Sequence, residues 1–225
     1  MHHIAKNERP YEKCIEHGAV SLSNAELLAV ILRSGTKGLS ALDLAHHLLS
    51  PKHGDDGILN LHHFTFQQLK SIKGIGSVKA IQILCLSELS KRLSKASAKK
   101  GLRLQCPSSI ADYFMEDMRH QKQEILKLLM VDSKSNLLGE SEMSKGTVNA
   151  SLISPRELFI EALEKHATGI ILAHNHPSGD PTPSSEDIML TRRVKDAGNI
   201  IGIELLDHII IGNNCYTSFL NENLL

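Results

Sequence analysis

The sequence predicts an α/β (α+β) protein, with a small all-helical N-terminal domain followed by a mixed β-sheet with flanking helices. Charge is the first observation. Residues 1–105 hold 15 Lys and Arg against 8 Asp and Glu (net +7), and residues 106–225 hold 10 against 17 (net −7). The second observation is the pattern of predicted helices and strands. Capped helical segments fill the basic half, and helical and strand segments alternate in the acidic half. Halves of opposite charge indicate two modules with different partners.

Composition sets the broad class. A chain of 225 residues has room for two modest domains, and its 41% hydrophobic content is ordinary for a globular protein. No apolar run approaches the ~20 residues that cross a bilayer, and no secretory signal opens the chain, so we expect a cytoplasmic protein without membrane contact. Its four scattered cysteines lack a Cys-x-x-Cys pair, which favours reduced thiols over a disulfide frame or a zinc knuckle.

Capping signals predict the helices of the basic half. Ser23, followed three residues later by Glu26, forms a capping box ahead of an apolar segment that reaches Leu32. Ser40 begins a second helix, which carries leucines at helical spacing. Residues 66–72 are predicted as a short apolar turn.

A glycine pair follows this turn. Residues 69–93 resemble a helix-hairpin-helix, with the hairpin at Gly74 and Gly76 and a second helix that ends near residue 93. In that motif, backbone N–H groups and a helix N-terminus meet DNA phosphates, and Lys73 and Lys79 would add screened attraction. These four residues are therefore candidate DNA-backbone contacts. The alternative is a plain glycine turn between two packed helices.

The two halves divide in a basic stretch of small residues, 94–101. We predict a helical domain over residues 1–100 and a sheet domain over residues 104–225. The stretch itself has a second interpretation, as the solvated end of a long helix.

The acidic half alternates between helix and strand. Pro107 and Pro155 each suit the first turn of a helix, the first of which runs to about Arg119. The predicted strands are residues 124–131, a hairpin partner from 137 toward 148, 170–173, a β-rich stretch over 200–211, and a last strand over 216–219.

A group of metal-binding residue types follows the strand at 170–173. His174 and His176 are two residues apart on an extended segment, so both imidazoles lie on one face. After a Pro- and Gly-rich turn, Ser184 suits a helix N-cap, and Asp187 is placed to aim a carboxylate back at the histidines. Two imidazoles and one carboxylate form the ligand set of a catalytic zinc, which predicts one zinc per chain. The alternative is a pair of packed or surface histidines in a His-rich chain.

This spacing carries a family resemblance. His-x-His, seven residues, Ser, two residues and Asp is the JAMM signature of the JAB/MPN metalloprotease fold. The longer sequence from His174 through Leu206-Asp207-His208 resembles the bacterial RadC family, and the resemblance covers roughly residues 106–225. Residues 22–28 and 72–76 resemble the N-terminal region of that family. The resemblance implies a zinc-dependent hydrolase that cleaves an amide, peptide or isopeptide bond in a protein or peptide substrate.

The resemblance also implies roles for two further residues. A glutamate just before the first core strand acts as the general base, and Glu124 holds that position. Ser184 would hydrogen-bond the oxyanion, although its hydroxyl equally suits the helix cap. Four other upstream glutamates stay open as the base: Glu140, Glu142, Glu157 and Glu161.

Residues beside the ligands have weaker assignments. Asp207 and His208 either orient a ligand or form a buried, hydrogen-bonded pair. Asn175 is expected to point to the opposite face from the two histidines. Asp180 is a rival carboxylate, which we expect the turn at Gly179 to hold in solvent.

Three functions compete. The leading hypothesis is a zinc hydrolase with an N-terminal targeting module. The alternative is a DNA-binding or DNA-repair-associated factor whose metal site is structural or inactive. A metal-dependent nuclease is the third, but nucleases gather several carboxylates around Mg²⁺, and this ligand set suits zinc better.

Overall fold

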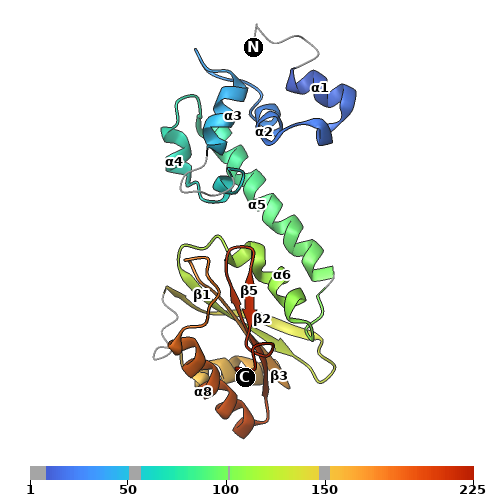
Figure 1. Cartoon of the computed structure of the whole chain (residues 1–225), viewed down its shortest axis with the longest axis vertical. Helices are drawn as coiled ribbons and strands as arrows, with labels where there is room; N and C mark the ends of the chain where they lie inside the picture. Colours follow the sequence, from blue (N-terminus) through green and yellow to red (C-terminus); the bar gives the residue numbers. More distant parts are fainter. Residues whose placement is uncertain (1–8, 51–56, 101, 147–152) are drawn as a thin grey trace. The chain divides into compact units, whose positions relative to one another are not determined.

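The computed structural model describes residues 9–50, 57–100, 102–146 and 153–225. The chain forms two compact units, Met1–Ser90 and Lys91–Leu225, and helix α5 (Ser77–Lys100) passes from one to the other (Figure 1). The division therefore falls ten residues before the end of α5. Within the described part of the chain, no helix is both long enough and apolar enough to span a membrane.

Short capped helices build the first unit. Capping boxes at Ser23, Ser40 and Thr65 start three of them. The helices and 3-10 turns before α5 are α1 (Pro10–His17), η2 (Ala19–Ser21), α2 (Asn24–Leu32), α3 (Ala41–Leu49), η3 (Leu59–His62) and α4 (Phe66–Ser71). The turn predicted at 66–72 is wrong: α4 occupies it, because Thr65 and Gln68 bond each other's main chain.

A glycine hairpin joins α4 to α5. The Ile75 N–H donates to Ile72 O at 3.0 Å, and the Ile75 side chain is buried in the core of the unit. Gly74 has φ +95°, and a Cβ there would lie 2.8 Å from Thr36 Cγ2. Conformation and packing thus both require glycine at this position. The following helix continues to Lys100 instead of ending near residue 93, which agrees with the long-helix interpretation of residues 94–100.

A five-stranded mixed sheet organises the second unit. Its order is β2-β1-β3-β4-β5, with β3 and β4 parallel and the other neighbours antiparallel. The elements are α6 (Pro107–Met118), β1 (Glu124–Val131), β2 (Leu137–Gly146), α7 (Pro155–Glu164), β3 (Gly169–Asn175), α8 (Ser185–Ile201), β4 (Glu204–Ile211) and β5 (Tyr216–Ser218). The predicted fold class is confirmed.

Two boundaries differ from the prediction. Residues 200 and 201 end α8 and do not begin a strand, because the helix stops only at Gly202, which adopts the left-handed conformation with φ +82°. The hairpin partner β2 is described to Gly146, and the predicted continuation to 148 lies outside the described residues.

Helices cover both faces of the sheet. Leu126, Leu128 and Leu172 pack with residues of α7 and α8, including Phe159 and Leu190. On the other face, the alternate strand residues pack with α6. Because side chains alternate along a strand, His174 shares the α7 and α8 face with Leu172.

A polar cluster lies on the α6 side of the sheet. Glu140 Oε1 accepts from Lys127 Nζ at 2.7 Å, Glu140 Oε2 accepts from the Tyr113 hydroxyl at 2.8 Å, and Lys95 bridges Asp117 and Glu140. Burial alone would raise the pKa of Glu140, yet the hydrogen bonds from Lys127 and Tyr113 hold this pKa below its ordinary value. The cluster joins β1, β2, α6 and the end of α5.

We expect Gly74→Ala to lower the free energy of unfolding by roughly 1–3 kcal/mol, because alanine must adopt a positive φ and meets Thr36. Gly76→Ala is the matched control, since a Cβ at Gly76 meets open space. Denaturant unfolding of both variants tests this, and equal stabilities would contradict the account of the hairpin.

We expect Glu140→Gln to lower the free energy of unfolding at pH 7 by about 1–3 kcal/mol, since charge-assisted hydrogen bonds are lost. A lowered folded-state pKa contributes stability above the unfolded value near 4.5, and this contribution disappears as the pH falls. The gap to wild type should therefore shrink in acid. Exposed Glu164→Gln serves as the control, and a gap that stays constant with pH would refute the assignment.

Candidate metal centre

Strand β3 and helix α8 bring the three predicted ligands together. His174 Nε2 lies 3.2 Å from Asp187 Oδ1 and 3.1 Å from His176 Nε2, and His176 Nε2 lies 3.4 Å from Asp187 Oδ2. The histidines stand at the end of β3, and Asp187 lies in the first turn of α8. The ligand atoms of these three residues all lie within 4.8 Å of one another.

The spacing fits zinc. With bonds of 2.0–2.2 Å, a tetrahedral zinc ion places its ligand atoms about 3.4 Å apart, close to the separations between these side chains. The His174 side chain is fully buried, whereas 14% of the His176 side chain is exposed. Three protein ligands leave a fourth position for water or substrate, and the site meets solvent on the His176 side.

The three side chains of this cluster shift one another's pKa values. Burial alone would raise the pKa of Asp187, yet hydrogen bonds from His174 and His176 hold this pKa far below its ordinary range. The hydrogen bond to Asp187 in turn raises the pKa of His176. The cluster thus pairs a carboxylate with two imidazoles, and binding of a metal ion would displace a proton that they share.

A helix cap fixes the carboxylate. Asp187 Oδ2 accepts from the Ser184 N–H at 2.8 Å and from the Ser184 hydroxyl at 2.6 Å, while the Asp187 N–H donates to Ser184 Oγ at 3.2 Å. This capping box orients the side chain through the backbone of α8. Ser184 therefore has the capping role that the sequence allowed, and its oxyanion role stays a prediction.

The turn after β3 fixes the second imidazole. His176 Nδ1 lies 2.8 Å from the backbone oxygen of Asp180. A carbonyl only accepts, so Nδ1 carries the proton and Nε2 faces the cluster. The exposed Asp180 carboxylate accepts from the N–H and hydroxyl of Thr182 and does not enter the cluster, as expected.

Asp207 and His208 lie behind His174 as a buried, hydrogen-bonded pair, in which the His208 N–H donates to Asp207 Oδ1 at 2.7 Å. His208 Nε2 lies 2.8 Å from His174 Nδ1, so His208 contacts a candidate ligand. Asp207 instead accepts from the Ser218 hydroxyl at 2.7 Å and from the Leu220 N–H at 2.9 Å, which holds the C-terminal turn. Of these two residues, His208 is the one whose side chain contacts a candidate ligand.

Glu124 begins the strand beside the histidines. Leu126 pairs with His174, so Glu124, two residues earlier, stands on the same face and level with His176. The hydrogen bond that His176 donates to Asp187 is the largest cause of the raised pKa of His176, and the negative charge of Glu124 is a smaller one. Glu124 is half-buried, at the side where the cluster meets solvent.

Asn175 contributes a contact that the sequence did not predict in detail. Its Oδ1 accepts from the Ile125 N–H at 2.9 Å, and its Nδ2 donates to Gln123 O at 3.2 Å. The amide thus holds the main chain on both sides of Glu124. This contact depends on strand pairing, which a local sequence pattern does not reveal.

The other upstream glutamates lie elsewhere. Glu140 belongs to the polar cluster near α6, and Glu161 accepts from the Ser141 hydroxyl at 2.8 Å. Glu142 is exposed on β2. The geometry therefore favours Glu124 as the base over these three residues.

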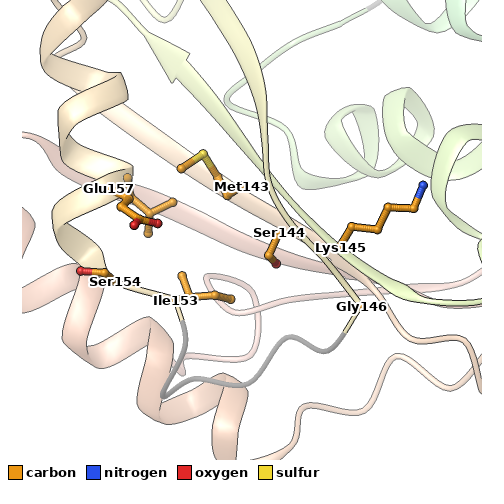
Figure 2. A pocket seen from close by; sticks show the side chains of 8 residues that line it. Met143, Ser144, Lys145, Gly146, Ile153, Ser154 and Glu157 are labelled. Carbon is orange, nitrogen blue, oxygen red and sulfur yellow. The ribbon is translucent and has the colours of Figure 1, made fainter.

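Glu157 lines a pocket of about 230 Å³ between the end of β2 and the start of α7 (Figure 2). Ser144 lines the same pocket, and Lys145 points away from it in the figure. Gly146, also at the rim, pairs with Glu124, so the pocket borders the first residue of β1. Its remaining lining residues are Met143, Ile153, Ser154 and Leu158.

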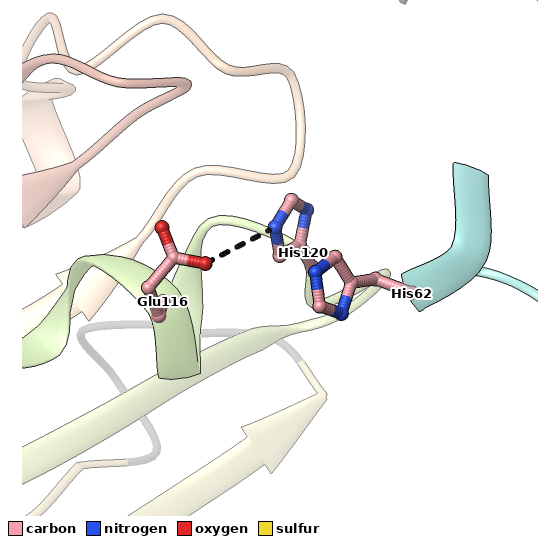
Figure 3. Close-up of side chains that lie close together, drawn as sticks. All are labelled: His62, Glu116 and His120. Atoms are coloured by element: carbon pink, nitrogen blue, oxygen red, sulfur yellow. Dashed lines mark ion pairs between the residues drawn. The ribbon is translucent and has the colours of Figure 1, made fainter. Parts of the chain in front are cut away.

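Figure 3 shows an ion pair between Glu116 and His120, which are four residues apart in the chain. His120 Nε2 lies 3.8 Å from a Glu116 carboxylate oxygen. His62 belongs to the first unit, whereas Glu116 and His120 belong to the second. We therefore assign no metal site to these side chains.

The candidate DNA contacts in the glycine hairpin differ in how accessible their polar groups are. Lys79 Nζ donates to three backbone oxygens, those of Ser34, Gly35 and Gly74. This lysine thus holds the hairpin in place. Exposed Lys73 and Gly76 remain the better candidates, and DNA contact stays a prediction.

Comparison with known proteins gives matches over both halves. A family model described as a RadC-like JAB domain matches residues 104–224, and one described as a UPF0758 N-terminal domain matches residues 1–81. Similar relatives are named only as UPF0758 proteins. One from Alkaliphilus metalliredigens is 45% identical over 97% of this chain and 94% of its own length. Those from Clostridium botulinum and Clostridium beijerinckii are 48% and 47% identical, over 96% and 99% of this chain and 93% and 96% of their own.

We expect about one zinc per wild-type chain by elemental analysis, and none in the double variant His174→Ala/His176→Ala, which loses two of three ligands. The matched control is His46→Ala/His47→Ala, which removes two exposed histidines from the first unit. Zinc retained by the first double variant would rule out the site.

Proposed function

Because the chain belongs to the family of proteins with a RadC-like JAB domain, we propose that it is a zinc-dependent metallohydrolase. Its substrate would be an amide bond, peptide or isopeptide, in a protein or peptide. One observation carries the proposal: the ligand atoms of His174, His176 and Asp187 have tetrahedral spacing, and Glu124 stands level with the exposed side of the cluster.

The residues divide the chemistry among themselves. When bound, zinc supplies Lewis acidity, which lowers the pKa of a water ligand and polarises a carbonyl. Glu124 takes a proton from the attacking water and delivers it to the leaving nitrogen. The Asn175 amide limits the movement of the main chain around Glu124, which keeps the carboxylate near the proton that it transfers.

Ser184 would stabilise the oxyanion that forms during attack. Its hydroxyl donates to Asp187 Oδ2 at 2.6 Å and so lies beside the candidate ligands. The Ser184 N–H donates to the same oxygen, so the carboxylate stays held when the hydroxyl turns to a substrate. Capping and catalysis are therefore compatible roles.

A second candidate function is DNA-associated binding with a structural or inactive metal site. It is supported by the basic first half and by the hairpin that exposes Lys73 and Gly76. The two candidates differ in what Glu124 does, because a binding protein has no use for a general base.

We expect Glu124→Gln to reduce peptide cleavage by a factor of roughly 10²–10⁴ while zinc binding persists, because the amide cannot accept the proton. A mass-spectrometric peptide-library screen with zinc-loaded protein measures this. Exposed Glu142→Gln is the matched control and should cleave like wild type. Equal cleavage by Glu124→Gln and wild type would refute the base. Zinc-loaded wild type that cleaves nothing would favour the second candidate.

A further inference from the structure

We propose that His208 and Thr191 are positioning residues, which hold His174 in the tautomer that leaves its Nε2 atom free for a metal ion. This inference rests on the proposed metal site, and it concerns how the chain prepares one ligand. Neither residue touches the substrate position. Both act through His174.

Three consecutive hydrogen bonds connect Asp187 to His174 through the interior. The Thr191 hydroxyl lies 2.7 Å from the backbone oxygen of Asp187 and 2.7 Å from His208 Nδ1. His208 Nε2 then lies 2.8 Å from His174 Nδ1. All four residues are buried, so water does not compete for these contacts.

The direction of each bond follows from the first. The Asp187 carbonyl can only accept, so the single hydroxyl proton of Thr191 points to it. Thr191 Oγ must then accept from His208, which places the proton of His208 on Nδ1. His208 Nε2 is left as an acceptor, and His174 Nδ1 donates to it. The remaining ring nitrogen of His174, Nε2, faces His176 and Asp187.

The packing around His208 holds its ring in the orientation that these hydrogen bonds require. The ring is fully buried and stacks on Phe219, with ring centroids 4.7 Å apart.

The arrangement affects the electrophilicity of the site. A carboxylate behind a ligating histidine raises its basicity, whereas a neutral imidazole transfers no full charge. His176 is likewise held by a neutral group, the carbonyl of Asp180. Asp187 is thus the only anion among the three candidate ligands, and a divalent ion there would keep a net positive charge. Asp187 has two parts in the site, since its side chain is a ligand and its carbonyl orders the histidines.

Thr191→Val and Thr191→Ser form the matched pair that tests this proposal. Valine keeps the shape but removes the hydroxyl, and serine keeps the hydroxyl. We expect the valine variant to bind zinc roughly 10–100-fold more weakly than wild type, measured by competition with a chromophoric chelator, and serine to restore affinity to within a few-fold. Equal zinc affinity of the valine and serine variants would overturn the proposed relay, which is the chain of hydrogen bonds from the Asp187 carbonyl through Thr191 and His208 to His174.

A second readout needs neither a variant nor activity. Long-range ¹H–¹⁵N correlation spectra of the full-length wild-type protein, zinc-loaded and metal-free, report which ring nitrogen of His208 carries the proton. We expect Nδ1–H in both states, and a proton on Nε2 would overturn the proposal. A purely structural role for Thr191 would not fix this tautomer.

The outcomes separate this inference from the proposed function. Zinc-loaded protein that cleaves no peptide, with His208 protonated on Nδ1 and affinity lost in Thr191→Val, leaves the relay standing and removes the hydrolase. Cleaving protein in which Thr191→Val binds zinc normally removes the relay and leaves the hydrolase. If the valine variant does not fold, the tautomer of wild-type His208 decides the question.

Discussion

The candidate site depends on one carboxylate that serves both a helix and a ligand cluster. Asp187 Oδ2 completes the capping box of α8 with Ser184, and its Oδ1 faces His174. Capping ties the side chain to the helix backbone, which itself packs on the sheet through Leu190 and Val194. The carboxylate therefore has a fixed position before any ion arrives. This limits the loss of conformational entropy when a metal binds.

Strand order supplies the remaining groups. Because β3 lies between β1 and β4, its two histidines are flanked by Glu124 on one side and His208 on the other. The parallel pairing of β3 with β4 sets Leu172 against His208, which brings that imidazole behind His174. The antiparallel pairing with β1 puts Glu124 level with His176. The proposed base, the two candidate histidine ligands and the proposed positioning residue thus come from three neighbouring strands and their ends.

Local chemistry explains which features the sequence could predict. Capping boxes and the alternation of strand side chains depend on residues close in the chain, so the helix at Ser23 and the common face of the two histidines were predictable. Helix α4 was not predicted, although Thr65 and Gln68 form a capping box like that of Ser23 and Glu26. The apolar residues that follow Thr65 fit a short turn equally well. The predicted start of the strand at residue 200 was wrong, because β-branched isoleucines also occur at the end of a helix that stops at a glycine.

Contacts between distant segments explain what stayed hidden. Thr191 stands four residues after Asp187, on the same helix face, but its partner His208 is fixed only by the β3–β4 pairing. Asn175 similarly meets β1 across a strand pair. The role proposed for Glu124, that of general base, rests on the family resemblance. The sheet register supports this proposal because it puts Glu124 level with His176, and this register could not be deduced from the sequence spacing alone.

The most direct test of the account is X-ray absorption spectroscopy at the zinc edge of the zinc-loaded, full-length protein. The account predicts a four-coordinate ion with two imidazole nitrogens and two oxygens, one from Asp187, at about 2.0–2.2 Å. A sulfur scatterer near 2.3 Å would mean that a cysteine binds the ion. That result, or a spectrum with no imidazole contribution, would contradict the site at the start of α8.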